Sequence, residues 1–103
     1  MEVKVETIGT TLVVKMNGEI DHHTAPEIKE KVERELAVKN IVNIVMDFDE
    51  VTFMDSSGIG MIVGRYKQIA AHGGKMMLIR VKPQVDRVLE VSGIKKLIEC
   101  NRG

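Results

Sequence analysis

The amino-acid sequence predicts an α/β domain in which an N-terminal hairpin precedes a mostly parallel mixed sheet with helices packed against it. Two segments rich in β-branched residues meet at Gly9 and Thr10, which is typical of a hairpin. After them, amphipathic helical patterns alternate with apolar runs of strand length, as in parallel strands joined by helices. The predicted order is ββαβαβαβ. A length of 103 residues supports one core, so residues 1–103 are expected to form a single domain.

The hairpin is expected to pair residues 2–8 with residues 11–16, where apolar and polar residues partly alternate. A helix follows, with Thr24 as the expected N-cap, Pro26 in the first turn and Glu27 completing a capping box. One face of this helix is apolar and is expected to lie in the core; it comprises Ala25, Ile28, Val32 and Leu36.

The second part of the chain repeats the strand and helix pattern. Residues 41–48 are almost continuously apolar, which predicts a central strand buried on both faces. A helical stripe ends at Gly73 and comprises Ile59, Ile62, Val63, Tyr66 and Ile69. A second buried strand is predicted at 75–81, Pro83 opens a short helix, and 96–100 form the last strand.

The connectors 18–24 and 49–57 and the one at Lys82 and Pro83 are expected to share one edge of the sheet. Strands joined by right-handed helical crossovers run parallel, so their carboxyl ends meet there, and binding is expected at that edge. The connectors contain five acidic residues, namely Glu19, Asp21, Asp49, Glu50 and Asp55. The edge should therefore attract a partner with a basic contact surface, unless these acids only keep the surface hydrated.

Charge and cysteine content exclude several classes of function. The 15 Lys and Arg balance 15 Asp and Glu, which excludes nucleic acid or an anionic membrane as the main partner. The balance is uneven, since residues 1–74 hold 8 Lys and Arg against 12 Asp and Glu, and residues 75–103 hold 7 against 3. The single Cys100 cannot form an internal disulfide, and no signal peptide or membrane span is evident, so a reducing cytoplasm is the expected location.

Ser56 and Ser57 stand where the second helix should begin, and two glycines, Gly58 and Gly60, follow them in its first turn. Either serine fits the N-cap position, and simple capping is one interpretation of the motif. A phosphate at this point would meet unpaired N–H groups and the partial positive charge of a helix N-terminus. The motif is therefore also compatible with a regulatory phosphorylation site.

Four blocks of sequence resemble the bacterial anti-sigma factor antagonists of the STAS class, most of all the anti-sigma F antagonists of endospore-forming bacteria. The blocks are residues 18–25, 53–60, 64–69 and 91–94. The Asp-Ser-Ser-Gly sequence from Asp55 is typical of the wider family, whereas Asp-His-His-Thr-Ala from Asp21 and Gly-Arg-Tyr-Lys-Gln from Gly64 are typical of the sporulation branch. The branch usually adds a C-terminal helix after the last strand, which the sequence to Gly103 does not include.

The resemblance implies a regulator controlled by phosphorylation at Ser56, with no enzymatic activity and no cofactor. The unmodified form would bind a protein that is both anti-sigma factor and serine kinase, and so release the sigma factor. That kinase would phosphorylate Ser56, and a serine phosphatase would reverse the modification. A phosphate beside Asp55 adds a charge of about −1.5 to −2, which would end binding by repulsion and desolvation without refolding. The implied contact residues are Asp21, His22, His23, Thr24, Asp55, Ser57, Gly58 and Ile59.

The sequence is also compatible with two other functions. A stress-response sigma pathway, or a nucleotide-binding or small-molecule-binding domain at the same edge, remains open. His22 and His23 alone supply too few ligands for a metal site, and Met54 stands where a serine hydrolase motif requires glycine. Met54 and Met61 are expected mainly as core residues, and Arg65 and Lys67 as solvated helix residues.

Overall fold

The computed structural model describes residues 1–103 and confirms the predicted alternation of strands and helices. It adds one 3-10 turn, η1, before the last strand. The elements are β1 (Val3–Ile8), β2 (Thr11–Ile20), α1 (Ala25–Val38), β3 (Asn43–Met54), α2 (Ser56–Ala70), β4 (Met76–Val81), α3 (Pro83–Ser92), η1 (Ile94–Lys96) and β5 (Glu99–Arg102).

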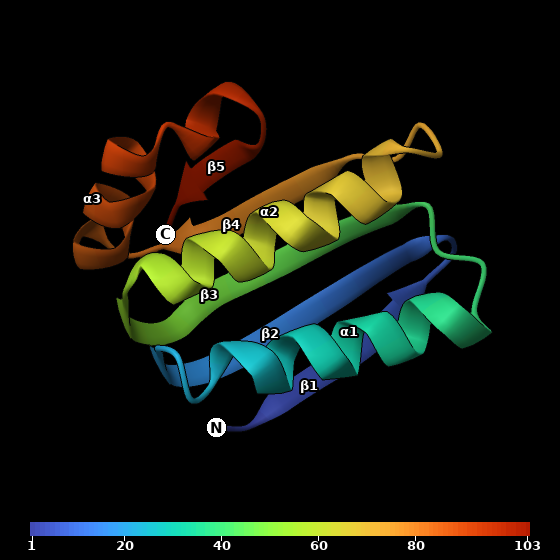
Figure 1. Ribbon diagram of the computed structural model, residues 1–103, viewed down its shortest axis with the longest axis horizontal. Helices are drawn as coiled ribbons and strands as arrows, with labels where there is room; N and C mark the ends of the chain where they lie inside the picture. The colour runs from blue at the N-terminus through green and yellow to red at the C-terminus, as the bar shows by residue number, and fades with distance from the viewer.

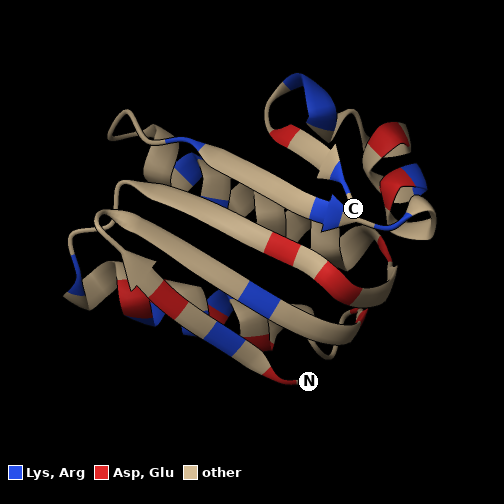
Figure 2. Ribbon diagram, turned by 180° about the vertical axis from the view of Figure 1, so that it is seen from behind, with Lys and Arg blue, Asp and Glu red and all other residues tan.

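The five strands form one mixed sheet in the spatial order β1-β2-β3-β4-β5. Strands β1 and β2 pair antiparallel, and every later pair is parallel, as expected for strands joined by helices. Helices α1 and α2 lie side by side on one face and begin at the same edge (Figure 1). In Figure 2 the sheet is seen from the opposite face, with these two helices behind it. The carboxyl ends of β2 and β3 therefore lead directly into the two helices at one edge.

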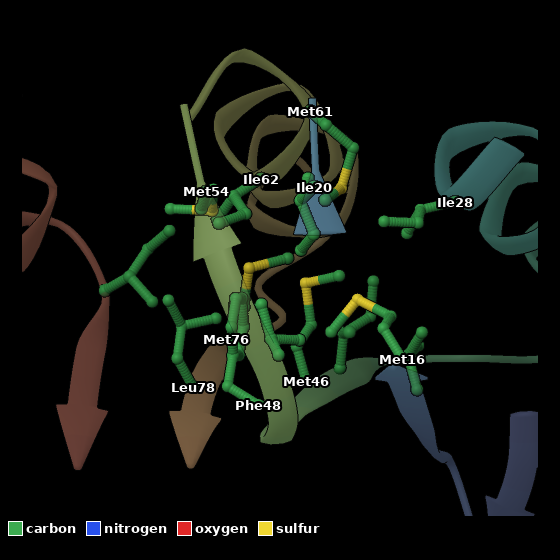
Figure 3. Close-up of a cluster of buried hydrophobic side chains, with 14 of the residues drawn as sticks. Met16, Ile20, Ile28, Met46, Phe48, Met54, Met61, Ile62, Met76 and Leu78 are labelled. Atoms are coloured by element: carbon green, nitrogen blue, oxygen red, sulfur yellow. The ribbon is translucent and has the colours of Figure 1, made fainter. Parts of the chain in front are cut away.

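The core lies between the sheet and helices α1 and α2, and Val85 and Leu89 of α3 belong to the same buried cluster. Alternate residues of β2 point into it, because successive side chains of a strand face opposite sides of the sheet. Figure 3 shows methionine side chains among aliphatic ones in this cluster. Met54 and Met61 are 2% and 5% exposed, so both belong to the core, as predicted.

Strands β2 and β3 run farther toward the common edge than the sequence predicts. The expected ends were residues 16 and 48, whereas β2 continues to Ile20 and β3 to Met54. The polar ends of the two strands pair with each other, with register shifts after Lys15 and Gly18 that place bulges in the ladder. The side chains of these two strand ends are polar and therefore predict connectors. Their backbone groups nevertheless pair with each other and extend both strands. The last strand is also displaced, beginning at Glu99, because η1 occupies the residues before it.

This extension corrects the expected acidic edge. Asp49 and Glu50 lie inside β3 and not in a connector. An oxygen of Asp49 is 3.6 Å from Arg80, and one of Glu50 is 3.8 Å from Lys15, so both carboxylates face cations on neighbouring strands. Only Glu19, Asp21 and Asp55 of the five expected acids therefore remain near the ends of β2 and β3.

Candidate functional site

Two segments predicted as contact regions meet at the edge where α1 and α2 begin. Ile20 and Met54, the last residues of β2 and β3, are register partners in the sheet. The Asp55 N–H donates to the Ile20 carbonyl at 3.1 Å, which ties the start of the second segment to the end of the strand before the first. We call residues 21–24 and 55–59 together the docking end of the molecule.

Asp55 is the N-cap of α2. Its backbone is extended, with φ −103° and ψ −172°, and its carboxylate accepts a hydrogen bond from the Ser57 N–H at 2.8 Å. The expected cap, Ser56 or Ser57, is therefore wrong, because the preceding aspartate has the same capping ability and is one position better placed. Ser56 becomes the first residue of the helix.

The Ser56 side chain is exposed and makes no hydrogen bond within the protein, whereas Ser57 is half-buried. Because Asp55 provides the cap, the Ser56 hydroxyl is free of a structural role and open to a modifying enzyme. A phosphate on it would lie at the positive end of a helix of 15 residues and next to the Asp55 carboxylate. The helix would tolerate the added group, while the negative charge of the surface would grow.

Asp21 performs the same function before α1. Its carboxylate accepts hydrogen bonds from the N–H groups of His23 at 2.9 Å and Thr24 at 3.0 Å. The Thr24 hydroxyl in return accepts from the Asp21 N–H at 2.9 Å and donates to the Glu19 carbonyl at 2.8 Å. The backbone donors of His23 and Thr24 lower the pKa of Asp21. Asp21 is therefore ionised at neutral pH and has no cationic side chain bound to it.

Thr24 is the N-cap residue of α1, as predicted, but the expected side-chain cap and the capping box to Glu27 are wrong. Thr24 has helical dihedral angles, and its side chain makes no cap hydrogen bond. The Ala25 N–H donates to the Asp21 carbonyl at 2.8 Å, so one turn of backbone from Asp21 to Ala25 precedes the helix. The reciprocal bonds that a capping box would have placed between Thr24 and Glu27 join Asp21 and Thr24 instead.

The two histidines of the docking end are exposed and lie against each other. The ring centroids of His22 and His23 are 4.0 Å apart with 39° between the planes. No group of three or more His, Cys, Asp and Glu side chains that could hold a metal ion is found in the structure. The two tilted rings present an accessible patch beside Asp21.

Gly58 controls how closely α2 approaches the strand ends. It is buried, and a Cβ at this position would come within 2.4 Å of the Met54 Cγ and Sδ atoms and 3.1 Å of Ile20 Cγ2. Gly60, by contrast, faces open space. The half-buried Ile59 lies between them and packs against the core cluster. The absence of a side chain at Gly58 therefore allows the start of α2 to pack closely on the ends of β2 and β3.

Phe53 and Arg65 were missed as potential functional residues. Phe53 is 48% exposed at the end of β3, opposite Glu19 in the sheet, an unusual exposure for a large aromatic side chain. Arg65 was expected to be solvated but is only 7% exposed, because it faces α1 across the contact between the helices. Its position between Ile62 and Ile69, three and four residues from the apolar stripe, is the sequence signal that could have indicated burial.

The Arg65 guanidinium contacts both α1 and α2, but one of its nitrogen atoms has no hydrogen-bond partner. Its Nε donates to the Gln68 side-chain oxygen at 2.7 Å, and its Nη2 is 3.5 Å from a Glu33 carboxylate oxygen. Its Nη1 is buried and has no hydrogen-bond partner. The nearby groove between the first turns of α1 and α2 has a volume of about 390 Å³ and is lined by His22, Ala25, Pro26, Lys29, Ser57, Gly60, Met61 and Arg65.

No helix of the chain combines the length and the apolar character that crossing a bilayer requires.

Comparison with known proteins gives consistent matches along the chain. The model of the STAS domain family matches residues 2–102. The anti-sigma F factor antagonist of Paenibacillus polymyxa is 36% identical over 98 residues, covering 95% of this chain and 84% of that protein. The anti-sigma-B factor antagonist of Listeria monocytogenes is 35% identical over 82 residues, covering 80% of this chain and 71% of that protein.

Solved structures of one anti-sigma factor antagonist, SpoIIAA, have the same fold. Its unphosphorylated form matches with a TM-score of 0.85 at 29% identity, covering 96% of this chain and 87% of that one. Its phosphorylated form from Bacillus matches with a TM-score of 0.75 at 28% identity, covering 96% and 90%. The fold is therefore known both with and without the modification in a similar protein.

Proposed function

The chain belongs to the STAS domain family, and from that premise we propose that it is an anti-sigma factor antagonist switched by phosphorylation of Ser56. In its unphosphorylated form it binds an anti-sigma factor that is also a serine kinase, and the sigma factor is released. The observation that carries this proposal is the free, exposed Ser56 hydroxyl beside the capping Asp55, at the edge where both helices begin. The names of the similar proteins support the same role.

The docking end provides the binding surface in this proposal. Asp21 and Asp55 each bind backbone N–H groups and no cationic side chain, so their charges remain available to a partner. The exposed rings of His22 and His23 lie between the two acids in sequence and add apolar contact area. A partner with a basic patch fits this surface.

Phosphorylation acts at this surface through desolvation and bulk, since added negative charge alone would attract a basic partner. The phosphate carries a charge of about −1.5 to −2 and must lose its water before a partner packs against the first turn of α2. The N-terminus of α2 can hold it without unfolding. That SpoIIAA has been solved in both forms with this fold supports a switch that changes the surface and not the architecture.

The protein is thus a ligand and a kinase substrate, and it needs a serine phosphatase to return to its active form. The single half-buried Cys100, whose pKa is raised by burial, suits the reducing cytoplasm in which sigma factors act. The anti-sigma F relatives favour sporulation as the setting.

Phosphorylation mapping tests the proposal directly. The purified protein is incubated with its kinase and ATP, and the modified residue is identified by mass spectrometry. Ser56 should be modified, Ser56→Ala should remain unmodified and bind the kinase constitutively, and Ser57→Ala should still be phosphorylated. Modification of Ser57 in the wild-type protein, or no binding to any verified anti-sigma kinase, would refute the proposal. Parallel assays with an anti-sigma F and an anti-sigma-B partner distinguish sporulation from stress response.

A further inference from the structure

The groove between the first turns of α1 and α2 has a cationic character that the rest of the docking end lacks. Arg65 forms part of its wall and is held on one edge by Gln68 and Glu33. A guanidinium has five N–H donors, and a buried donor without an acceptor is costly, so native proteins rarely leave one unpaired. The Nη1 of Arg65 is an unpaired donor of this kind, in a side chain that lines the groove.

Two further features make the groove suitable for an anionic group. Lys29, on the α1 side, is exposed and forms no ion pair within the protein. Helices α1 and α2 begin side by side at the same edge (Figure 1). Residues near their N-termini line the groove, and helix N-termini carry partial positive charge. Glu33 is the carboxylate that binds Arg65, so two cationic side chains face one anionic one.

The position of the groove identifies the source of the anion. His22 and Ser57 line the groove and belong to the two segments of the docking end, so a protein bound there covers the groove as well. An excess of one positive charge in a solvent-open groove binds a free anion weakly. A carboxylate carried by a docked protein is presented at a high effective concentration and overcomes that weakness.

We propose that this groove receives an aspartate or glutamate side chain of the anti-sigma partner, an inference that rests on the proposed function. The partner would then present a basic patch to Asp21 and Asp55 and an acidic side chain to Lys29 and Arg65. Two opposite charge contacts on neighbouring parts of one surface fix the orientation of the partner more firmly than a uniformly acidic surface does.

The first test compares two lysines. Lys29→Gln removes a cation from the groove, and Lys67→Gln removes one from an exposed position of α2 outside it. Affinity for the anti-sigma kinase should fall about five- to tenfold for Lys29→Gln and less than about twofold for Lys67→Gln, measured by calorimetry at two salt concentrations. Equal losses, or no loss for Lys29→Gln, would overturn the proposal.

The second test uses Glu33→Gln, which removes the negative charge that competes for Arg65. If the groove receives a carboxylate, this variant should bind the partner more tightly, by about twofold to fivefold, whereas a merely structural ion pair predicts weaker binding. Urea denaturation of the same variant reports any loss of stability separately. Unchanged or weaker partner binding by a folded Glu33→Gln protein would count against the groove.

The third test probes the isolated protein and does not depend on a partner. Acetate at high concentration, about 0.1 M, should shift the Arg65 side-chain N–H resonances, and more strongly in Glu33→Gln. No shift would overturn the groove proposal even if the kinase binds. Inorganic phosphate binding far more tightly than acetate would point to a phosphate ligand in place of a side chain. Failure of the wild-type protein to bind any anti-sigma kinase, with the acetate shift present, would instead overturn the proposed function.

Discussion

Aspartates serve two different purposes at the docking end and at the β4–β5 side of the molecule. Asp21 and Asp55 hold backbone N–H groups and have no cationic partner. Asp86, in α3, is 5% exposed and is bound by Lys95 at 2.8 Å and Arg102 at 2.9 Å. At the docking end, therefore, aspartate carboxylates hold the backbone and keep their charge available to a partner. On the β4–β5 side, the Asp86 carboxylate is paired with cations and stabilises the tertiary structure.

Asp47 repeats the second arrangement in the middle of the sheet. It is 6% exposed and accepts a hydrogen bond from Arg80 Nε at 3.1 Å, across from β3 to β4. Arg80 has a positive φ of 55° at the point where the β4–β5 register shifts, so this ion pair accompanies an irregular stretch of strand. Changes to the paired acids should therefore affect folding, and changes to the docking acids should affect binding.

Asp86→Ala should produce the largest loss of stability. It removes an anion shared by Lys95 and Arg102 and loosens β5, which pairs with β4 over few residues. We expect about 2–3 kcal/mol less free energy of unfolding in urea, below the usual cost of a broken buried pair because Arg102 can turn to water. Glu90→Gln is the matched control: Glu90 contacts the same Lys95 but is exposed, and it should cost less than about 0.5 kcal/mol. Weaker kinase binding by folded Asp86→Ala would contradict the expectation that the paired acids affect only folding.

Gly58→Ala should affect stability and binding together, because this residue lies where the docking end rests on the core. The added methyl group would overlap Met54, and overpacking of this kind costs about 1–3 kcal/mol. Displacement of α2 should also lower kinase affinity. Gly64→Ala is the control, since a Cβ there would meet nothing within 4 Å and Gly64 lies outside the groove, and it should stabilise the protein by up to about 1 kcal/mol. Thermal unfolding and calorimetry measure the two effects, and unchanged kinase binding by Gly58→Ala would show that the docking end does not depend on this contact.

Acid should destabilise the protein through its paired aspartates. Hydrogen bonds from Lys95 and Arg102 lower the pKa of Asp86 despite its burial. Burial alone would raise the pKa of Asp47, but hydrogen bonds from Arg80 and the Asp49 N–H outweigh it and lower the pKa. Both ionised carboxylates therefore stabilise the folded protein when the pH is above 3.8, their ordinary pKa. This contribution is lost as the pH falls through the lowered pKa of each group in the folded protein.

The measurement is the free energy of unfolding from pH 7 down to pH 3. Asp86→Asn should lose less stability than the wild-type protein over this range, by about 1 kcal/mol. If the free energy of unfolding changed with pH in the same way in both proteins, the pKa of Asp86 would not be lowered by folding.

The sequence allowed the order of elements and the core to be predicted, because apolar periodicity reports burial directly. It did not allow the side-chain cap bonds to be predicted, since Asp and Ser or Thr stand close together in both docking segments and cap about equally well. The true ends of β2 and β3 were missed because pairing between Asn17 and Glu50, or Gly18 and Val51, is a property of the register and not of the side chains. The ion pair of Arg65 with Glu33 joins residues far apart in sequence, so only the packing of α1 on α2 reveals it.

The smallest expected effect on stability, and the sharpest test of the comparison, comes from Asp55→Asn. Asparagine caps helices as well as aspartate does, so the hydrogen bond to the Ser57 N–H should persist, and stability should change by less than about 0.5 kcal/mol. The charge that faces the partner is lost, however, and kinase affinity should fall about threefold to tenfold with a weaker dependence on salt. Calorimetry at low and high salt, beside urea denaturation, separates the two roles. If Asp55→Asn lost stability but kept its affinity, Asp55 would be a structural cap alone, and the charge of the docking end would have to reside in Asp21.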